Sequence, residues 1–450
     1  MTNKKFKLAA MSLATAVAVS TVGPSASAVT YYLGNGDITV DQDEDRGAYS
    51  YQGEDGSEEH RTYVNADKED NGAIYVKDGN APTETEPSTD NSDNGTEETT
   101  PTDTTTDSSA DNAENSTTTE TAPGNTITVM EDVKKTDKAD GTEGNDVKIV
   151  VDGVNVNTST QTDTPAEVPA DADTKENKTI IKVGEGAAVD LTVRDSNLTT
   201  GGNGIDIGVN LKDDDDNKET NVDLTLDNTK VNLTQNGKVG INVQDNSNVD
   251  LTLKGENAID GSKAIENEDL KKNVNVEGIR VGGGGAGDGS GASEGAKTHL
   301  TISGGVEKTE TAEADTEETE SPAGGSLTIS KTTGGLVMAD GSDVEITDGA
   351  DVTIEDTKTS SSTQAGRAVT QHGDLTLSGG SSLTIDGGKD NKAPHTGIGI
   401  ASWDDITVED GSTLDISGAA TGIYGHQGAS LTTEDSTLNI TNSDAGIRYE

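Results

Sequence analysis

Cysteine is absent from this chain of 450 residues, and basic side chains are scarce, with 32 Lys and Arg against 83 Asp and Glu. Without cysteine the chain can form no disulfide framework, no thiolate-bound zinc site and no cysteine-held iron–sulfur cluster. The formal net charge of -51 also argues against a nucleic-acid-binding surface, because phosphate recognition depends on clustered Lys and Arg. We therefore expect no nucleic acid among its partners.

Large apolar side chains are few as well. Hydrophobic residues make up 29% of the chain and aromatic residues 2%, with a single Trp and a single Phe. At this net charge, such a composition suggests intrinsic disorder. Beyond the extreme N-terminus no apolar run is long enough for a membrane-spanning helix, so we expect no membrane span.

The N-terminus has the layout of an export signal. Lys4, Lys5 and Lys7 precede an apolar run over residues 8–22, and the small-residue triplet 26–28 follows. This pattern predicts a signal peptide over residues 1–28 that is cleaved after the triplet. A membrane anchor is the alternative, but the run is too short to span a bilayer. We expect a bacterial extracellular protein, either secreted or associated with the cell wall.

Two acidic tracts interrupt the chain. Residues 78–124 contain no Lys, Arg, Leu, Ile or Val and are mostly Thr, Ser, Glu, Asp, Asn and Pro, and residues 306–322 have a similar acidic, Thr-rich character. A Gly-rich piece spans residues 282–291. Segments of this kind have little to bury, so we predict that 78–124 is disordered and that the other two are flexible.

The remainder is periodic. Short runs such as Leu191-Thr192-Val193 and Leu224-Thr225-Leu226 alternate aliphatic and polar residues. Alternation with a period of two places the aliphatic side chains on one face of a strand. No comparable stretch has a period of 3.6, so helices should be nearly absent.

The spacing of these strands is regular. Leu375 and Leu383 are eight residues apart, as are Ile406 and Leu414, and the cycle from Leu375 to Ile406 takes 31 residues. A third strand follows at a variable distance, so two gaps are nearly constant and one absorbs insertions. This favours a solenoid with three strands per coil over a β-sandwich of short strands. Residues that tolerate positive φ occupy the first turns, namely Asp348-Gly349, Gly379-Gly380 and Asp410-Gly411.

Units such as 374–400 and 439–447 resemble the right-handed parallel β-helix of the pectin-lyase-like superfamily, and in particular the non-catalytic secreted or surface members of gut Gram-positive bacteria. The resemblance covers residues 145–450 and, more faintly, 32–76. It implies an all-β fold of coils about 4.8 Å apart with an aliphatic interior.

The predicted organisation is a signal peptide (1–28), an N-terminal β segment that forms the first coils or a cap (29–77), the disordered tract (78–124), and a β-helix over 125–450 that is interrupted near 282–323. Because the chain stops just after a strand, we expect the β-helix to continue beyond residue 450.

An enzyme is considered because the superfamily includes polysaccharide lyases and hydrolases. Gly204–Gly208 and Trp403-Asp404-Asp405 echo the hydrolase pattern, but its Gly-His-Gly is replaced by Gln371-His372-Gly373 and Gly425-His426-Gln427-Gly428, and the Arg-x-Lys is missing. The negative charge would also repel an acidic sugar. We therefore predict no enzymatic activity, with a lyase or hydrolase as the third choice of function.

Calcium is a candidate ligand. Aligning the first turns of the last two coils places Glu409 beside Glu434 and Asp410 beside Asp435, where like charges repel unless a cation intervenes. Oxygen-rich sites of this kind suit Ca²⁺, and the run Asp213–Asp216 is a further candidate. Splayed, hydrated carboxylates are the alternative.

The aromatic residues near the C-terminus suggest a binding patch. Trp403, Tyr424 and Tyr449 follow a long stretch with no aromatic residue, and aligning the last two Gly-Ile pairs of the chain places Tyr424 opposite Arg448. Sugar recognition commonly uses aromatic faces, so we predict that these four residues bind a ligand. Incidental packing in the turns is the alternative.

Together these patterns predict a non-enzymatic stalk or adhesin that makes weak multivalent contacts with host or plant glycans or with surface proteins. A carbohydrate-binding β-helix with calcium-assisted structure is the second choice.

Overall fold

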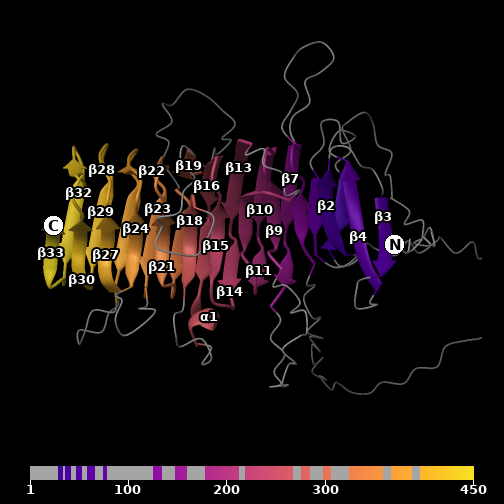
Figure 1. The fold of residues 1–450 in the computed structure, drawn as a ribbon, viewed down its shortest axis with the longest axis horizontal. Coiled ribbons are helices and arrows are strands. Elements are labelled where there is room, and N and C mark those ends of the chain that lie inside the picture. Colours follow the sequence, from indigo (N-terminus) through magenta and orange to yellow (C-terminus); the bar gives the residue numbers. More distant parts are fainter. Residues whose placement is uncertain are drawn as a thin grey trace, which may run out of the picture.

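The alternating runs form short strands that, in the computed structural model, succeed one another along a single axis from β3 to β33 (Figure 1). The structure describes residues 29–33, 36–41, 47–52, 58–65, 74–78, 125–133, 147–159, 178–211, 218–266, 275–283, 297–305, 324–357, 366–387 and 396–450. The predicted signal peptide, most of the tract 78–124, the tract 306–322 and Asp213–Asp216 lie outside these residues.

The strands make three sheets, which we name A, B and C. Sheet A has 11 strands: β1 (Val29–Tyr32), β5 (Ile74–Lys77), β7 (Val147–Asp152), β10 (Ala188–Arg194), β13 (Thr220–Asp227), β16 (Ser247–Lys254), β19 (Thr298–Gly304), β22 (Ser342–Thr347), β25 (Leu375–Leu377), β28 (Ile406–Val408) and β31 (Leu431–Thr433). Sheet C has nine strands: β8 (Asn155–Asn157), β11 (Asn197–Thr200), β14 (Lys230–Leu233), β17 (Glu256–Asp260), β20 (Ser326–Ser330), β23 (Asp351–Glu355), β26 (Ser382–Asp386), β29 (Thr413–Ser417) and β32 (Thr437–Thr441). Sheet B has 13 strands: β3 (Gly47–Gln52), β4 (Glu58–Asn65), β2 (Asp37–Asp41), β6 (Ile127–Val129), β9 (Ile181–Gly184), β12 (Ile205–Val209), β15 (Lys238–Val243), β18 (Val276–Val281), β21 (Gly334–Met338), β24 (Arg367–Gln371), β27 (Thr396–Ser402), β30 (Ala419–Gly425) and β33 (Ala445–Tyr449).

From β7 onward the chain visits sheets A, C and B in turn, and each strand pairs in parallel with its equivalents in the neighbouring coils. The nine strands of sheet C mark nine coils of three strands. This confirms the predicted all-β fold, a parallel β-helix with three strands per coil. The β-sandwich alternative is wrong, because consecutive strands belong to different sheets instead of pairing as hairpins.

The N-terminal strands depart from this cycle. β1 and β5 join sheet A, whereas β2, β4 and β6 join sheet B. β3 pairs antiparallel with β4 and is the outermost strand of sheet B at this end. The antiparallel strand therefore occupies the edge that a parallel coil would otherwise continue.

Aliphatic rows fill the interior. Leu191, Leu224 and Leu251 lie side by side in β10, β13 and β16, and none of them is exposed. The threonine after each leucine is partly exposed on the outer face of sheet A. Since every inward residue packs on its equivalent in the next coil, a narrow core needs few large side chains, which explains the low aliphatic content without disorder.

A row of glycines lets sheet B approach sheet C closely. At Gly278 an added Cβ would lie 2.3 Å from Ile329 Cγ2 and 2.5 Å from the carbonyl oxygen of Gly335, and at Gly240 it would lie 2.5 Å from Ile259 Cγ2. No side chain fits at these two positions. Glycine also occupies the equivalent position at β12, β21, β27, β30 and β33, whereas β24 has the small residue Ala368 there.

The turns and insertions partly follow the prediction. The first-turn residues have positive φ as expected, for example 50° at Asp348 and 70° at Gly349. However, insertions are not confined, as the sequence predicted, to the gap before the third strand of a coil. Residues 306–323 lie between β19 and β20, at a turn from sheet A to sheet C that is short in the other coils. Within the described residues, the only helix is α1 (Ser262–Glu266), which is too short to cross a membrane.

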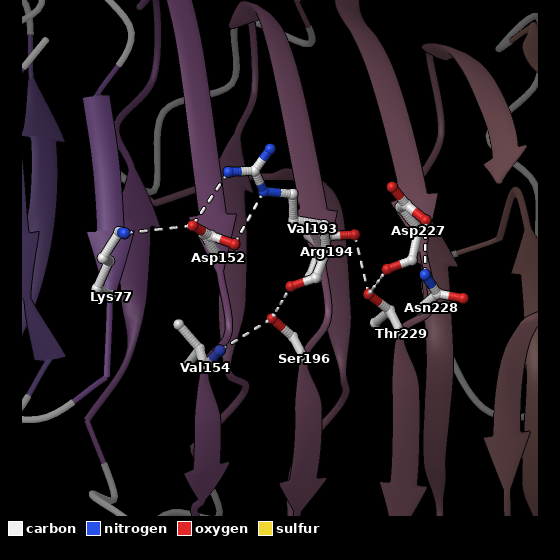
Figure 2. Close-up of polar contacts among 9 residues, drawn as sticks. All are labelled: Lys77, Asp152, Val154, Val193, Arg194, Ser196, Asp227, Asn228 and Thr229. Atoms are coloured by element: carbon white, nitrogen blue, oxygen red, sulfur yellow. Dashed lines mark hydrogen bonds and ion pairs between the residues drawn. The ribbon is translucent and has the colours of Figure 1, made fainter. Parts of the chain in front are cut away.

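Charges alternate along one outer row of sheet A (Figure 2). Asp152 on β7 pairs with Arg194 on β10 through two hydrogen bonds of 2.8 and 3.1 Å, and with Lys77 on β5 at 3.4 Å. The row continues in register to Asp227 and Lys254. Hydrogen bonds from Arg194 lower the pKa of Asp152, against the smaller opposing effect of burial.

Buried hydroxyls join the same coils at the turn into sheet C. Ser196 Oγ donates to the carbonyl of Arg194 at 2.7 Å and accepts from the Val154 amide at 3.1 Å, and Thr229 Oγ1 donates to the carbonyl of Val193 at 2.9 Å (Figure 2). These bonds satisfy backbone groups that the turn removes from the sheets.

Candidate functional site

The most distinctive side chains outside the core occupy equivalent positions where successive sheet B strands end. The backbone N–H groups of Trp403, His426 and Glu450 each donate to the preceding coil, at 3.0, 2.8 and 3.1 Å, and His372 does the same at 3.2 Å. The four residues therefore form one row across β24, β27, β30 and β33. We call His372, Trp403 and His426 the ring row.

The three rings of the ring row stack face to face. The centroids of His372 and Trp403 are 4.1 Å apart, those of Trp403 and His426 are 3.9 Å apart, and both interplanar angles are 12°. Each distance is shorter than the usual spacing of about 4.8 Å between paired strands. The rings therefore tilt toward one another and are in van der Waals contact. Both faces of the Trp403 indole are thus covered, and it presents its edge to the outside.

Buried polar residues hold the turns that carry the rings. Gln371 is fully buried, and its Nε2 donates to the carbonyls of Gly373 at 2.7 Å and Asp405 at 2.6 Å. Ser402 Oγ donates to the carbonyl of Asp404 at 2.7 Å. These bonds hold the backbone on either side of His372 and Trp403. They therefore fix the positions of the Cα atoms from which the two rings project.

Two arginines and a tyrosine flank the ring row. The Tyr424 ring meets His426 edge-on, with centroids 4.8 Å apart, and the Arg448 guanidinium carbon lies 5.7 Å from the Tyr424 centroid. The guanidinium carbon of Arg367 lies 5.4 Å from the Trp403 centroid. Such distances are within the range of cation–π attraction.

The structure confirms the predicted pairing of Tyr424 with Arg448 and brings Trp403 to the same edge through His426. Tyr449 does not join the other three. It pairs with Gly425, and its ring lies against that glycine, because adjacent residues of a strand point to opposite faces.

The imidazoles are partly buried, and an arginine lies nearby. The Nε2 atoms of His372 and His426 have almost no solvent contact and find no hydrogen-bond partner among the residues that the structure describes. Burial lowers the pKa of His426, and the nearby Arg367 charge lowers it further. His372 differs because its Nδ1 lies 3.3 Å from Asp340 Oδ1.

Carboxylates border the ring row on two sides. Burial raises the pKa of Asp404, and repulsion from Asp374 and Asp405 adds to the rise. On the other side, the Tyr424 hydroxyl hydrogen-bonds to Glu450, which raises the pKa of the tyrosine and lowers that of the glutamate.

The candidate calcium residues lie in adjacent coils, as aligned. The Glu434 amide donates to the Val408 carbonyl, and the Gly411 amide donates to the Asp435 carbonyl, so Glu409 and Asp410 face the equivalent turn of the next coil. Across the described ranges, however, no three His, Asp or Glu side chains gather as a metal-binding group. Calcium binding at these pairs stays a prediction.

Asp206, the acidic residue of the hydrolase-like string, is buried in a network of amides. Its Oδ1 accepts from Asn242 at 2.6 Å and from Gln244 at 3.1 Å, and its Oδ2 accepts from Asn203 at 3.1 Å. In this structure the carboxylate joins neighbouring coils.

Sequence reasoning missed three members of the site: His372, His426 and Arg367. The two histidines were considered only as imperfect catalytic strings. Aligning the Gly-Ile pairs before Trp403 and His426, and the equivalent Ala-Val before His372, would have placed all three rings in one row.

Comparison of the chain with protein-family models, with curated proteins and with solved structures finds no match.

Proposed function

We propose that this chain is an extracellular, non-enzymatic β-helix that acts as a stalk or adhesin, and that it contacts its partner through the ring row and the residues flanking it. The observation that carries the proposal is the clustering of Trp403, Tyr424, Arg367 and Arg448 at one edge. These include the chain's one Trp and two of its six Arg residues. In a chain of net charge -51, such a cluster differs from the Thr-, Asn- and Asp-bearing outer faces elsewhere.

The fold supports an elongated, surface-displayed role. Nine coils at about 4.8 Å each span roughly 40 Å, and every coil contacts only its neighbours. The N-terminal pattern that resembles a signal peptide supports export. From the resemblance of the periodic units to the pectin-lyase-like superfamily, we also propose that the solenoid is right-handed and related in architecture to the non-catalytic members.

The partners we propose are glycans or surface proteins of a host or of plant material. Tyr424 and Arg448 are the accessible members of the edge, since the Trp403 faces are covered. A ligand would meet an aromatic ring edge, a phenol hydroxyl and guanidinium donors, which suits a polar, hydroxyl-rich surface.

The test is a binding screen against host and plant glycans and cell surfaces with two double variants of the full chain. Tyr424→Ala with Arg448→Ala removes a ring and a cation from the edge, while Tyr75→Ala with Lys148→Ala removes the same kinds of group from sheet A near the other end. We expect the first variant to lose binding and the second to keep it. Equal binding by both would refute the proposed contact edge.

The same screen separates the stalk or adhesin from a dedicated carbohydrate-binding module. Loss of one dominant glycan ligand in the Tyr424/Arg448 variant would favour the module, whereas a graded loss over many weak ligands would favour multivalent adhesion.

A further inference from the structure

His426 covers one face of the Trp403 ring from a turn on the surface. It is the first residue after β30, and the next two residues, Gln427 and Gly428, are exposed. Gly428 has a φ of 106°, and the turn closes with a hydrogen bond of 3.1 Å from the Ala429 amide to the His426 carbonyl. A rotation of the imidazole outward would therefore disturb a short surface turn and leave the buried aliphatic rows in place.

A neutral imidazole fits this position better than a charged one. The Nε2 atom of His426 has almost no solvent contact and no hydrogen-bond partner among the described residues, so a proton carried on Nε2 would have no acceptor until the ring moves outward. Tyr424 approaches the ring edge-on, and the charge of Arg367 opposes protonation, whereas Glu450 favours it. The charged and titratable groups around the ring row are Arg367 on β24, His372 after β24, Tyr424 on β30, Arg448 and Glu450 at β33, and Asp340, Asp374, Asp404 and Asp405 in the adjoining turns.

The two imidazoles of the stack differ in how they can accept a proton. His372 Nδ1 lies beside the Asp340 carboxylate, which can accept a hydrogen bond from a protonated ring. No carboxylate is within ion-pair distance of His426 in the described part of the chain. Attraction between an imidazolium and the indole face would hold a charged His426 in place, but Arg367 already lies over the same indole.

We propose that His426 is a pH-controlled cover, and that its protonation in mildly acidic solution releases the imidazole and exposes one face of the Trp403 ring. The inference rests on the proposed function, because it assigns a regulation to the same contact edge. At neutral pH the edge offers Tyr424 and the arginines. Below the pKa of His426 it also offers an indole face, the kind of surface on which a sugar ring can pack. The ligand class that acid would recruit is therefore a neutral glycan.

Because Trp403 is the only tryptophan, fluorescence excited at the long-wavelength edge of the tryptophan band, where the eight Tyr residues absorb little, reports on this ring alone. The experiment measures acrylamide quenching of that fluorescence between pH 7.5 and 4.5. We expect the quenching constant to rise roughly twofold as one of two covered faces opens, with a midpoint below the ordinary histidine pKa of about 6.5. The quenching constant is divided by the fluorescence lifetime at each pH, so an imidazolium that only shortens the lifetime while staying stacked would leave the resulting rate constant unchanged.

Three variants make the result specific. His426→Phe keeps a stacking ring that cannot titrate, and we expect a low quenching constant at every pH. His426→Gln removes the ring, and we expect a high constant at every pH. His372→Phe is the matched control on the other face and should keep the response of the wild-type chain. Circular dichroism at each pH checks that the solenoid is intact.

A pH-independent constant in the wild-type chain would overturn the proposal, as would a pH-dependent rise that persists in His426→Phe. Neither result depends on ligand binding. Conversely, if the quenching response is as expected but no glycan or surface binds at pH 7.5 or pH 5, the proposed function fails while the cover stands.

Discussion

Replacing Gly278 with alanine tests how closely sheet B approaches sheet C. The new Cβ would lie 2.3 Å from Ile329 Cγ2, 3.1 Å from Ile329 Cδ1 and 2.5 Å from the Gly335 carbonyl oxygen. Contacts below about 3 Å do not persist between carbon atoms, so the isoleucine must leave its rotamer and the neighbouring coil must shift. The isoleucine is fully buried, and the third contact is backbone, so neither can move into solvent.

The expected cost follows from two opposing effects. Overpacking of a well-packed core costs about 1–3 kcal/mol. The alanine also restricts the unfolded chain, which stabilises by about 0.4–1 kcal/mol. We therefore expect Gly278→Ala to lower the free energy of unfolding by about 1–2 kcal/mol.

The assay is chemical denaturation followed by far-ultraviolet circular dichroism, with the midpoint and slope both fitted. Gly446→Ala is the matched control, since Gly446 also precedes the aliphatic residue of a sheet B strand, yet no atom lies within 4 Å of its added Cβ. We expect the control to match the wild type or to exceed it slightly. If Gly278→Ala is as stable as the control, close approach is not the reason for the glycine row.

Three further predictions concern charge. Asp250→Asn should stabilise the chain by about 0.2–1 kcal/mol, because Asp250 lies in register beside Asp223. The same change at Asp227, between Arg194 and Lys254, should destabilise it, and the opposite signs should shrink together in 1 M salt. Arg194→Gln should cost about 0.5–1 kcal/mol at pH 7, a small value because Arg194 is 42% exposed. Since the pKa of Asp152 is lowered in the folded state, that stabilisation is present above the ordinary carboxyl pKa of about 3.9 and is lost as the pH falls below it, so denaturation midpoints of variant and wild type should converge near pH 2. Finally, if the acidic turns of the last two coils bind calcium, the melting temperature should be higher in millimolar Ca²⁺ than in chelator or equal Mg²⁺, and identical values would exclude the site.

Much of the coil geometry could be predicted because it depends on local periodicity. Alternation identifies the buried face of each strand, and the turn residues mark where the chain changes sheet. The order β3-β4-β2 in sheet B could not be predicted, since alternation says which face of a strand is buried but not which strand is its neighbour. The position of the insertion between β19 and β20 in the coil could not be predicted, because its acidic composition carries no information about which turn it extends.

The candidate site shows the same division. The pairing of Tyr424 with Arg448 followed from aligning two adjacent Gly-Ile pairs. The stacking of His372 on Trp403 was missed because the two residues are 31 positions apart along the chain, with an insertion between them, and the residues beside each histidine give no sign of a common role.

In a β-helix, an outward side chain interacts mainly with its equivalents one coil before and one coil after, about 4.8 Å away. For a chain with this excess of carboxylates, that geometry is unfavourable wherever like charges align, and it is relieved only where signs alternate, as in the row from Lys77 to Lys254. Neutral rings escape this conflict, because stacked rings attract one another at the distance that neighbouring coils allow. An imidazole in such a row has this advantage only while it is neutral. The ring row should therefore be sensitive to protons, and His426, whose pKa is lowered by burial and which has no carboxylate within ion-pair distance among the described residues, is the member whose protonation should open it.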